Sequence, residues 1–233
     1  DLENPAHRAE LAQIWGIDKA ILPIARGKTA VELFDAVKSG EIKAVWIACT
    51  NPAHSMPDIG SVRAALEAAE LVVVQEVFAD TDTMAFADVV LPARTWGEKE
   101  GVVTNTERRI SRVRPAVPAV GEAMGDWWIA AQFARKLARR IRPGLETLFD
   151  AVFNDYRATT AGRDIDITGL DYALLDTGPR QWPLPAGSNE GTARLYTDHV
   201  YQTASGKAQF NAVKYQPVAE SVSSRYPFRL LTG

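Results

Sequence analysis

Residues 42–75, IKAVWIACTNPAHSMPDIGSVRAALEAAELVVVQ, hold two apolar runs with a helical pattern between them. The runs at 42–49 and 71–75 are almost continuously apolar, which is typical of strands covered on both faces, as in a parallel sheet. Residues 58–70 show the apolar spacing of a helix. A strand–helix–strand unit of this length predicts two parallel strands joined by a right-handed crossover.

The alternation of helix and strand continues on both sides of this unit. Residues 29–40 predict a helix that begins at Thr29, forms a capping box with Glu32 and ends at Gly40. Residues 88–92, DVVLP, predict a third buried strand after a capped loop. The fold class we predict is α/β, a Rossmann-like and mostly parallel sheet with flanking helices.

The later part of the chain has a different pattern. Residues 126–141 and 145–158 predict two helices, and the first of them is amphipathic. Residues 193–213 alternate well enough to predict a small β-hairpin that turns at Ser205 and Gly206. The second half is therefore expected to be a helical segment followed by this hairpin.

These patterns divide the chain into two predicted regions. Residues 1–115 are expected to form part of a dinucleotide-binding α/β domain. Residues 116–233 are expected to form a helical and irregular region with a β-hairpin, leading into a domain that lies outside this chain. Because only three strands support the first region, we expect the chain to be an internal fragment of a longer protein.

Composition excludes several classes of function. The chain has 233 residues and a net charge of −3, which gives no reason to expect nucleic acid as a partner. It has no apolar run long enough for a membrane span and no signal peptide, so we expect a cytoplasmic protein. A single cysteine, Cys49, excludes an intramolecular disulfide and a metal cluster held by cysteines alone. We expect Cys49 to be buried and inert.

Polar residues follow each predicted strand, at the edge where open parallel sheets bind ligands. They are Thr50, Asn51, Pro52 and His54 after the first strand, Gln75, Glu76, Asp80, Thr81 and Thr83 after the second, and Asn105, Arg108 and Arg109 after the third. The carboxylate of Glu76 could accept hydrogen bonds from a ribose or from a guanine edge, and arginines suit phosphate. An ordinary Asn-Pro turn, capping residues and a solvated basic face are the alternative interpretations.

The chain carries none of the common short motifs of catalysis or phosphate binding: no GxSxG, HExxH, GxxxxGK[ST] or GxGxxG. Trp127 and Trp128 lie in the first turn of a predicted helix. We expect them to pack against a neighbouring domain rather than to stack on bases. A non-catalytic interaction domain that uses this tryptophan pair stays an alternative.

Residues 42–114 resemble the molybdopterin oxidoreductase family of the dimethyl-sulfoxide-reductase type. The segments that carry the resemblance include ADVVLP at 87–92, WGEKEG at 96–101 and TNTERR at 104–109. Later segments, such as QWPLP and TASGKAQF, are similar to the same family in the same order. The pattern is most similar to that of assimilatory nitrate reductases, and formate dehydrogenases share much of it.

The resemblance implies a bis(molybdopterin guanine dinucleotide) molybdenum cofactor and assigns residues to it. Thr50, Asn51, Pro52 and His54 match a loop near a pterin dinucleotide, and Glu76 matches an acidic residue that reads guanine. Thr81 and Thr83 match the turn beside its ribose or phosphates. Lys99, Asn105, Arg108 and Arg109 match a segment near the cofactor.

The same resemblance implies what this chain lacks. The family's cysteine motif for an iron–sulfur cluster and its cysteine ligand to molybdenum are expected in a preceding part of the polypeptide. The implied reaction is the reduction of nitrate to nitrite, which the fragment alone would not catalyse. The expected partners are the other domains of the same polypeptide and an electron-donor protein. A formate dehydrogenase fragment and a stand-alone nucleotide-binding module are the alternatives.

Overall fold

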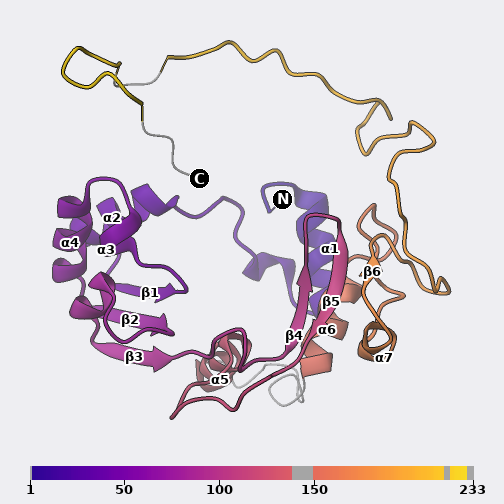
Figure 1. The fold of residues 1–233 in the computed structure, drawn as a ribbon, viewed down its shortest axis with the longest axis horizontal. Helices are drawn as coiled ribbons and strands as arrows, with labels where there is room; N and C mark the ends of the chain where they lie inside the picture. The colour runs from indigo at the N-terminus through magenta and orange to yellow at the C-terminus, as the bar shows by residue number, and fades with distance from the viewer. Residues whose placement is uncertain (1, 138–148, 218–220, 230–233) are drawn as a thin grey trace. The chain divides into compact units, whose positions relative to one another are not determined.

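A computed structural model describes residues 2–137, 149–217 and 221–229 (Figure 1). The chain divides into two units, Asp1–Ala193 and Arg194–Gly233. Each unit is described by itself, and the first contains all of the helices and strands of the described residues.

A parallel sheet of three strands forms the centre of the first half. Its strands are β1 (Ala44–Ala48), β2 (Leu71–Glu76) and β3 (Val89–Pro92), and they lie side by side in that order. The register pairs Val45 with Val72 and Val74 with Val90. The predicted parallel α/β sheet is therefore confirmed, with all three strands ending at the same edge.

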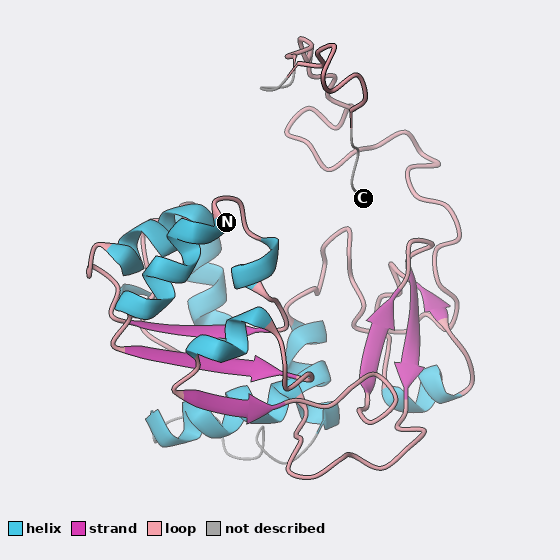
Figure 2. Cartoon of the chain, turned by 60° about the vertical axis from the view of Figure 1, so that its left-hand side comes forward, coloured by secondary structure: helices cyan, strands magenta, loops and turns pink. Residues whose placement is uncertain are grey.

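Helices lie on both faces of this sheet (Figure 2). They include α2 (Ala30–Lys38), α3 (Pro52–Ser55), α4 (Ile59–Ala68) and, after β3, α5 (Asp126–Leu137); the short η2 (Asp82–Phe86) precedes β3. Trp46 of β1 meets Phe133 of α5 edge to face, with ring centroids 4.8 Å apart. Residues 138–148 lie outside the described residues. The structure therefore does not test where the predicted helix 126–141 ends or where the predicted helix 145–158 begins.

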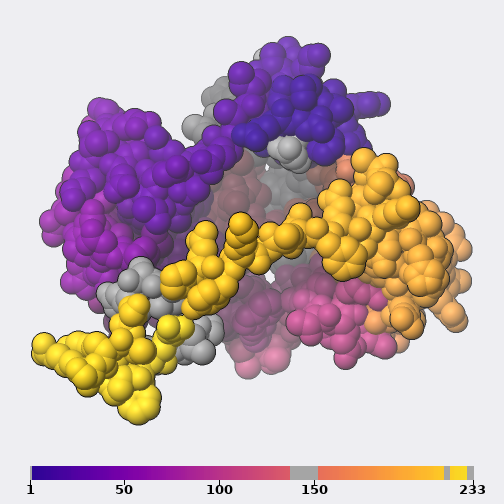
Figure 3. Space-filling model, turned by 90° about the horizontal axis from the view of Figure 1, so that it is seen from above, coloured from indigo at the N-terminus to yellow at the C-terminus, as the bar shows by residue number. Residues whose placement is uncertain are grey.

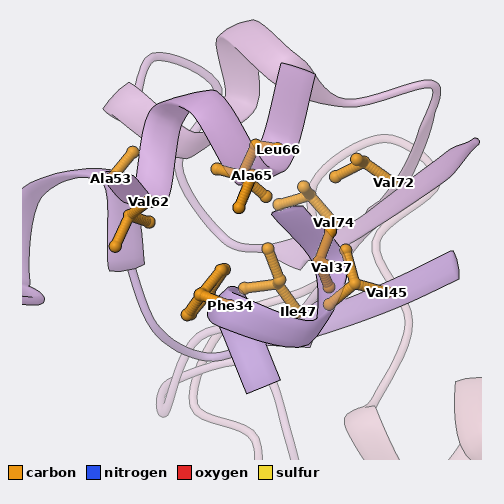
Figure 4. Close-up of a cluster of buried hydrophobic side chains, with 10 residues drawn as sticks. All are labelled: Phe34, Val37, Val45, Ile47, Ala53, Val62, Ala65, Leu66, Val72 and Val74. Atoms are coloured by element: carbon orange, nitrogen blue, oxygen red, sulfur yellow. The ribbon is translucent and has the colours of Figure 1, made fainter. Parts of the chain in front are cut away.

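The main hydrophobic core lies between the sheet and helices α2 to α4 (Figure 4). Its buried residues are Phe34, Val37, Val45, Ile47, Ala53, Val62, Ala65, Leu66, Val72 and Val74. Val45 and Ile47 reach this core because alternate residues of a strand point to the same face. Trp46, between them, contacts α5 instead.

The capping box at the start of α2 forms as predicted. The Thr29 amide donates to Oε2 of Glu32 at 2.7 Å, and the Glu32 amide donates to Oγ1 of Thr29 at 3.4 Å. Helix α4 begins after Asp58, whose side chain accepts from the Ser61 amide at 3.3 Å. These local contacts satisfy amide groups that the first turn of a helix otherwise leaves unpaired.

A second, antiparallel sheet follows the first. It consists of β4 (Gly101–Thr104), β5 (Arg109–Val113) and β6 (Arg180–Gln181). Two helices, α6 (Phe149–Ala158) and α7 (Tyr172–Asp176), belong to the same region. Its core comprises Ile110, Phe153, Ile167, Leu170, Leu175 and Leu184. The first unit also includes α1 (Pro5–Trp15) and η1 (Lys19–Ile21) near the start of the chain.

The hairpin predicted across Ser205 and Gly206 is wrong. The described residues after 193 contain no strand; Tyr201 and Gly206 are joined by one backbone bond of 2.9 Å in a local turn. Phe210 is 96% exposed and Val213 is 89% exposed, so the alternating pattern has no face to bury and no sheet to join. Figure 3 shows this unit, coloured orange to yellow, as a narrow run of residues. The small antiparallel sheet comes instead from β4, β5 and β6.

None of the helices in the described ranges combines the length and the apolar character that crossing a membrane requires.

Candidate functional site

A cavity of about 290 Å³ lies at the carboxyl edge of the parallel sheet. It is lined by the last two residues of β2, by residues that follow each of the three strands and by the first residue of α5: Cys49, Gln75, Glu76, Val77, Phe78, Ala93, Arg94, Thr95, Trp96, Lys99 and Asp126. Ligands of open parallel sheets bind at this edge, because the strand ends leave a crevice there. The cavity is therefore the candidate site.

The carboxylate of Asp126 joins the parts of this site. Its Oδ1 accepts from Nε2 of Gln75 at 2.8 Å and lies 3.6 Å from Sγ of Cys49. Its Oδ2 accepts from Nζ of Lys99 at 3.0 Å. Gln75 is only 4% exposed, so its amide depends on this carboxylate for a partner. Asp126 is also the first residue of α5, where the helix dipole favours a negative charge.

Opposing effects set the protonation of Asp126. Burial raises the pKa of its carboxyl, but the hydrogen bonds from Gln75 and Lys99 and the charge of Lys99 lower it by more. The pKa of Asp126 therefore lies below its ordinary value, and the group is ionised at neutral pH. It balances the positive charge of Lys99 at the wall of the cavity.

Cys49 is exposed, so the prediction that it is buried is wrong. Strand β1 ends at Ala48, and Cys49 begins the turn with a left-handed φ of 60°, which takes its side chain out of the alternation of the strand. Partial burial and the neighbouring Asp126 carboxylate raise the pKa of the thiol. A raised pKa leaves less of the nucleophilic thiolate at neutral pH, and the predicted lack of reactivity stays a prediction.

Glu76 is the last residue of β2, and its carboxylate accepts hydrogen bonds from the backbone of the turn that follows. Its Oε1 accepts from the amide of Val77 at 2.7 Å and from the amide of Phe78 at 3.3 Å. Its carboxylate is thereby fixed at the cavity wall, where the other oxygen accepts no hydrogen bond from the described residues. This side chain and Lys99 are the two residues predicted from the resemblance that line the cavity.

The loop after β1 is fastened to the segment before β3. Oδ1 of Asn51 accepts from the amide of Thr83 at 3.1 Å and from its hydroxyl at 2.7 Å. The Thr83 hydroxyl accepts from the Ala53 amide at 3.1 Å, and Thr83 is completely buried. Thr83 and Asn51 therefore hold two loops of the sheet edge together.

The remaining predicted residues of these loops differ in exposure. Thr50 is exposed, and Pro52 is buried at the first position of α3. His54 lies with Nδ1 3.4 Å from Oδ2 of Asp82, and its side chain is 74% exposed. The Thr81 hydroxyl is buried and has no hydrogen-bond partner among the described residues.

The arginine-rich hairpin lies apart from the cavity lining. Oδ1 of Asn105 accepts from the amides of Glu107 and Arg109, both at 3.0 Å, which shapes the turn between β4 and β5. Arg108 has a left-handed φ of 65°. Its guanidinium donates to the carbonyl of Trp182 and, at 3.0 Å each, to those of Thr192 and Ala193. Nε of Arg109 donates to Glu107 at 3.0 Å.

The sequence did not show which residues of the site meet in the fold. Gln75 was visible as a strand end and Asp126 as a helix start, but nothing in the sequence showed that they meet. Arg94 lines the cavity while its Nε donates to the Ala123 carbonyl at 2.9 Å. Trp96 lines it also. The contacts of Asp126 with the lysine and the glutamine of the wall span 27 and 51 residues of sequence, beyond the reach of any local pattern.

Comparison with known proteins agrees with this architecture. A model of the molybdopterin oxidoreductase family matches residues 10–136, more than half of the chain and all of the parallel sheet. The chain belongs to the molybdopterin oxidoreductase family. The match confirms the resemblance that the sequence segments carry.

Relatives of this family member include nitrate reductases and formate dehydrogenases. It is 36% identical to a nitrate reductase of Synechocystis over all of this chain and 33% of that protein. It is 34% identical to the assimilatory nitrate reductase catalytic subunit of Bacillus subtilis, covering 32% of that protein. A formate dehydrogenase alpha subunit of Methanocaldococcus jannaschii is 38% identical over 89% of this chain. The chain spans about a third of the length of these relatives.

A solved structure shows the same fold. The acetylene hydratase of Pelobacter acetylenicus matches 86% of this chain and 26% of its own, with a TM-score of 0.56 and 21% identity. Among the described residues of this family member, no group of three or more His, Cys, Asp or Glu side chains is arranged to hold a metal ion.

We predict that two threonines of the site respond differently to the same substitution. Thr83→Val removes a buried hydroxyl that bonds Asn51 and Ala53 and should lower the free energy of unfolding by about 1–3 kcal/mol. Thr81→Val removes a buried hydroxyl without a partner among the described residues and should be neutral or slightly stabilising. Urea unfolding followed by circular dichroism measures both. Equal losses for the two variants would contradict the role given to Thr83.

We also predict that acid weakens the contacts of Asp126. Because its pKa is lowered in the folded protein, its stabilisation is complete above the unfolded aspartate pKa of about 3.9 and is lost as the pH falls through the folded value. The Asp126 side chain is 31% exposed, so Asp126→Asn should cost only about 1 kcal/mol at pH 7. The cost should shrink below about pH 4.

Unfolding midpoints in urea from pH 7 to pH 3 test this prediction. The same substitution in a Lys99→Met background is the matched control, since the cation that favours the ionised carboxylate is then absent. A difference between the wild type and the Asp126→Asn variant that is the same at every pH would show that the carboxylate's charge is not involved.

Proposed function

We propose that this chain is the cofactor-binding part of a molybdenum oxidoreductase that reduces nitrate to nitrite. The observation that supports it is the cavity at the carboxyl edge of the sheet, with Glu76 and Lys99 in its wall, in a chain of the molybdopterin oxidoreductase family. Nitrate reductases among the relatives support the choice of substrate. The fragment itself carries binding, and the reaction belongs to the longer protein.

The residues present fit one end of a bis(molybdopterin guanine dinucleotide) cofactor. The Oε2 atom of Glu76 can accept from the N–H groups of a guanine edge, and the carboxylate is already oriented by two backbone amides that donate to its Oε1. Arg94, which has no carboxylate partner among the described residues, supplies positive charge in the same wall for phosphate, while the charge of Lys99 is balanced by Asp126. A volume of about 290 Å³ suits a nucleoside, so the remainder of the cofactor would be held by other residues.

The other predicted residues have two proposed roles. Thr50 and His54 are exposed at the same sheet edge and could contact the cofactor. Asn51, Pro52, Thr81 and Thr83 are proposed to shape that edge, and Asn105, Arg108 and Arg109 to hold the hairpin that borders the cofactor region. When bound, the molybdenum centre supplies two-electron oxygen transfer, while this chain's residues bind and orient the guanine end.

The proposed partners are the other domains of the same polypeptide and an electron-donor protein, in the cytoplasm. An iron–sulfur cluster would be held by cysteines outside this chain, since Cys49 is its single cysteine. A formate dehydrogenase is the second candidate, because two relatives of that name are 38% and 34% identical to this chain.

The mass, molybdenum content and activity of the native gene product distinguish these candidates. We expect it to be several times larger than 25.5 kDa, to contain molybdenum, and to reduce nitrate with a reduced viologen dye much faster than it oxidises formate. Faster formate oxidation would favour the second candidate. A native product of 25.5 kDa that binds guanine nucleotides and has no molybdenum would favour the stand-alone nucleotide-binding module.

We predict that Glu76→Gln lowers the cofactor content of the purified gene product. The amide presents a donor as well as an acceptor and loses the charge, so a guanine contact weakens by about 1.5–3 kcal/mol. Molybdenum by mass spectrometry and GMP released by acid hydrolysis measure the loss. Glu70→Gln, an exposed glutamate paired with Lys43 outside the cavity, is the matched control. Unchanged molybdenum and GMP in the Glu76 variant would contradict the guanine contact.

A further inference from the structure

Two large aromatic side chains line the cavity and yet stay open to water. Phe78 is 66% exposed and Trp96 is 65% exposed, and both belong to the cavity wall beside Glu76. Leaving two such rings in water forgoes the stabilisation that their burial would give. Aromatic rings gathered next to a carboxylate suit a ligand that is planar and carries N–H donors on one edge.

The segment that presents Trp96 is held rigidly. Glu98 is only 8% exposed, and its Oε2 accepts from the Thr95 amide at 2.9 Å. The Glu98 amide donates to the Thr95 carbonyl at 3.1 Å, which closes the turn that carries Trp96. The indole is therefore offered from a fixed backbone rather than from a loose loop, which lowers the ordering cost of binding.

Lys99 occupies one face of the indole. Its Nζ lies 5.0 Å from the centroid of the Trp96 ring while it donates to Asp126 at 3.0 Å. About two thirds of the surface of Trp96 is nevertheless exposed, which leaves ring surface available to a stacking ligand. Phe78 is positioned by a different contact from those that hold Trp96, because its amide donates to Oε1 of Glu76 at 3.3 Å.

We propose that Trp96 and Phe78 form an aromatic platform on which the purine base of a guanine nucleotide stacks while Glu76 reads its edge. This inference rests on the proposed function and deepens it, because it assigns base stacking to two residues of the same cavity. Stacking on an aromatic ring stabilises adenine and guanine alike, whereas the carboxylate of Glu76 favours guanine over adenine. The two contributions are therefore separable by substitution.

The test uses the full gene product prepared free of cofactor, with GMP and AMP as probes in equilibrium dialysis. Trp96→Leu and Phe78→Leu keep apolar bulk and remove the ring, and each should raise the dissociation constant for both nucleotides by about 5- to 150-fold. Trp96→Phe should retain most of the affinity. Glu76→Gln should weaken GMP binding and leave AMP binding unchanged.

Trp15→Leu is the matched control, because Trp15 is 44% exposed at the end of α1 and does not line the cavity. It should change neither dissociation constant, and the melting temperatures of all variants should agree. If both leucine variants bind GMP as the wild type does while Glu76→Gln does not, the platform is overturned and the proposed function stands.

A second measurement separates the two ideas fully. GMP released by acid from the loaded wild-type protein reports the proposed function without relying on the platform. A loaded protein that releases GMP, together with leucine variants that bind GMP as tightly as the wild type, overturns the platform alone. A loaded protein that releases no GMP overturns the proposed function and the platform with it.

Discussion

The carboxylate of Asp126 is where the end of the parallel sheet and the start of α5 meet. It contacts Gln75 near the end of β2, Cys49 directly after β1, and Lys99 in the segment after β3. Each strand end would otherwise present its own polar groups to water. One ionised side chain brings them together around a shared space, and the cavity at the sheet edge has its shape for that reason.

Local signals in the sequence predicted most of the α/β half, because the capping box of α2 and the three apolar strands depend on residues close together in the chain. The pairing of Asn51 with Thr83 could not be predicted in the same way, since only the fold brings them within hydrogen-bond distance. The hairpin expected within 193–213 failed for a related reason. Alternation specifies a strand only where one face has something to bury against, and the core that Ile110 enters from β5 has no counterpart near Phe210.

The arginines of the hairpin formed by β4 and β5 show that a cluster of basic residues in the sequence does not by itself predict a binding site for an anionic ligand. Arg108 donates to three backbone carbonyls, and Arg112 pairs with Glu100 and lies 3.8 Å from the centroid of the Tyr172 ring. Their guanidinium groups are therefore engaged by other groups of the same chain. The cavity wall takes its cations from the loop before the hairpin, and of these Lys99 is paired with Asp126 while Arg94 has no carboxylate partner among the described residues.

The contacts of Arg108 also determine the order in which parts of the chain can fold during synthesis on the ribosome. Its partners Trp182 and Thr192 come 74 and 84 residues later. At a synthesis rate of about 5–20 residues per second, the finished hairpin must wait about 4–17 s for the segment that fastens it. The parallel sheet has no such delay, since only α3 and α4 separate β1 from β2. The nascent chain would therefore hold a formed sheet beside an arginine-rich hairpin whose guanidinium at Arg108 still lacks its three carbonyl partners.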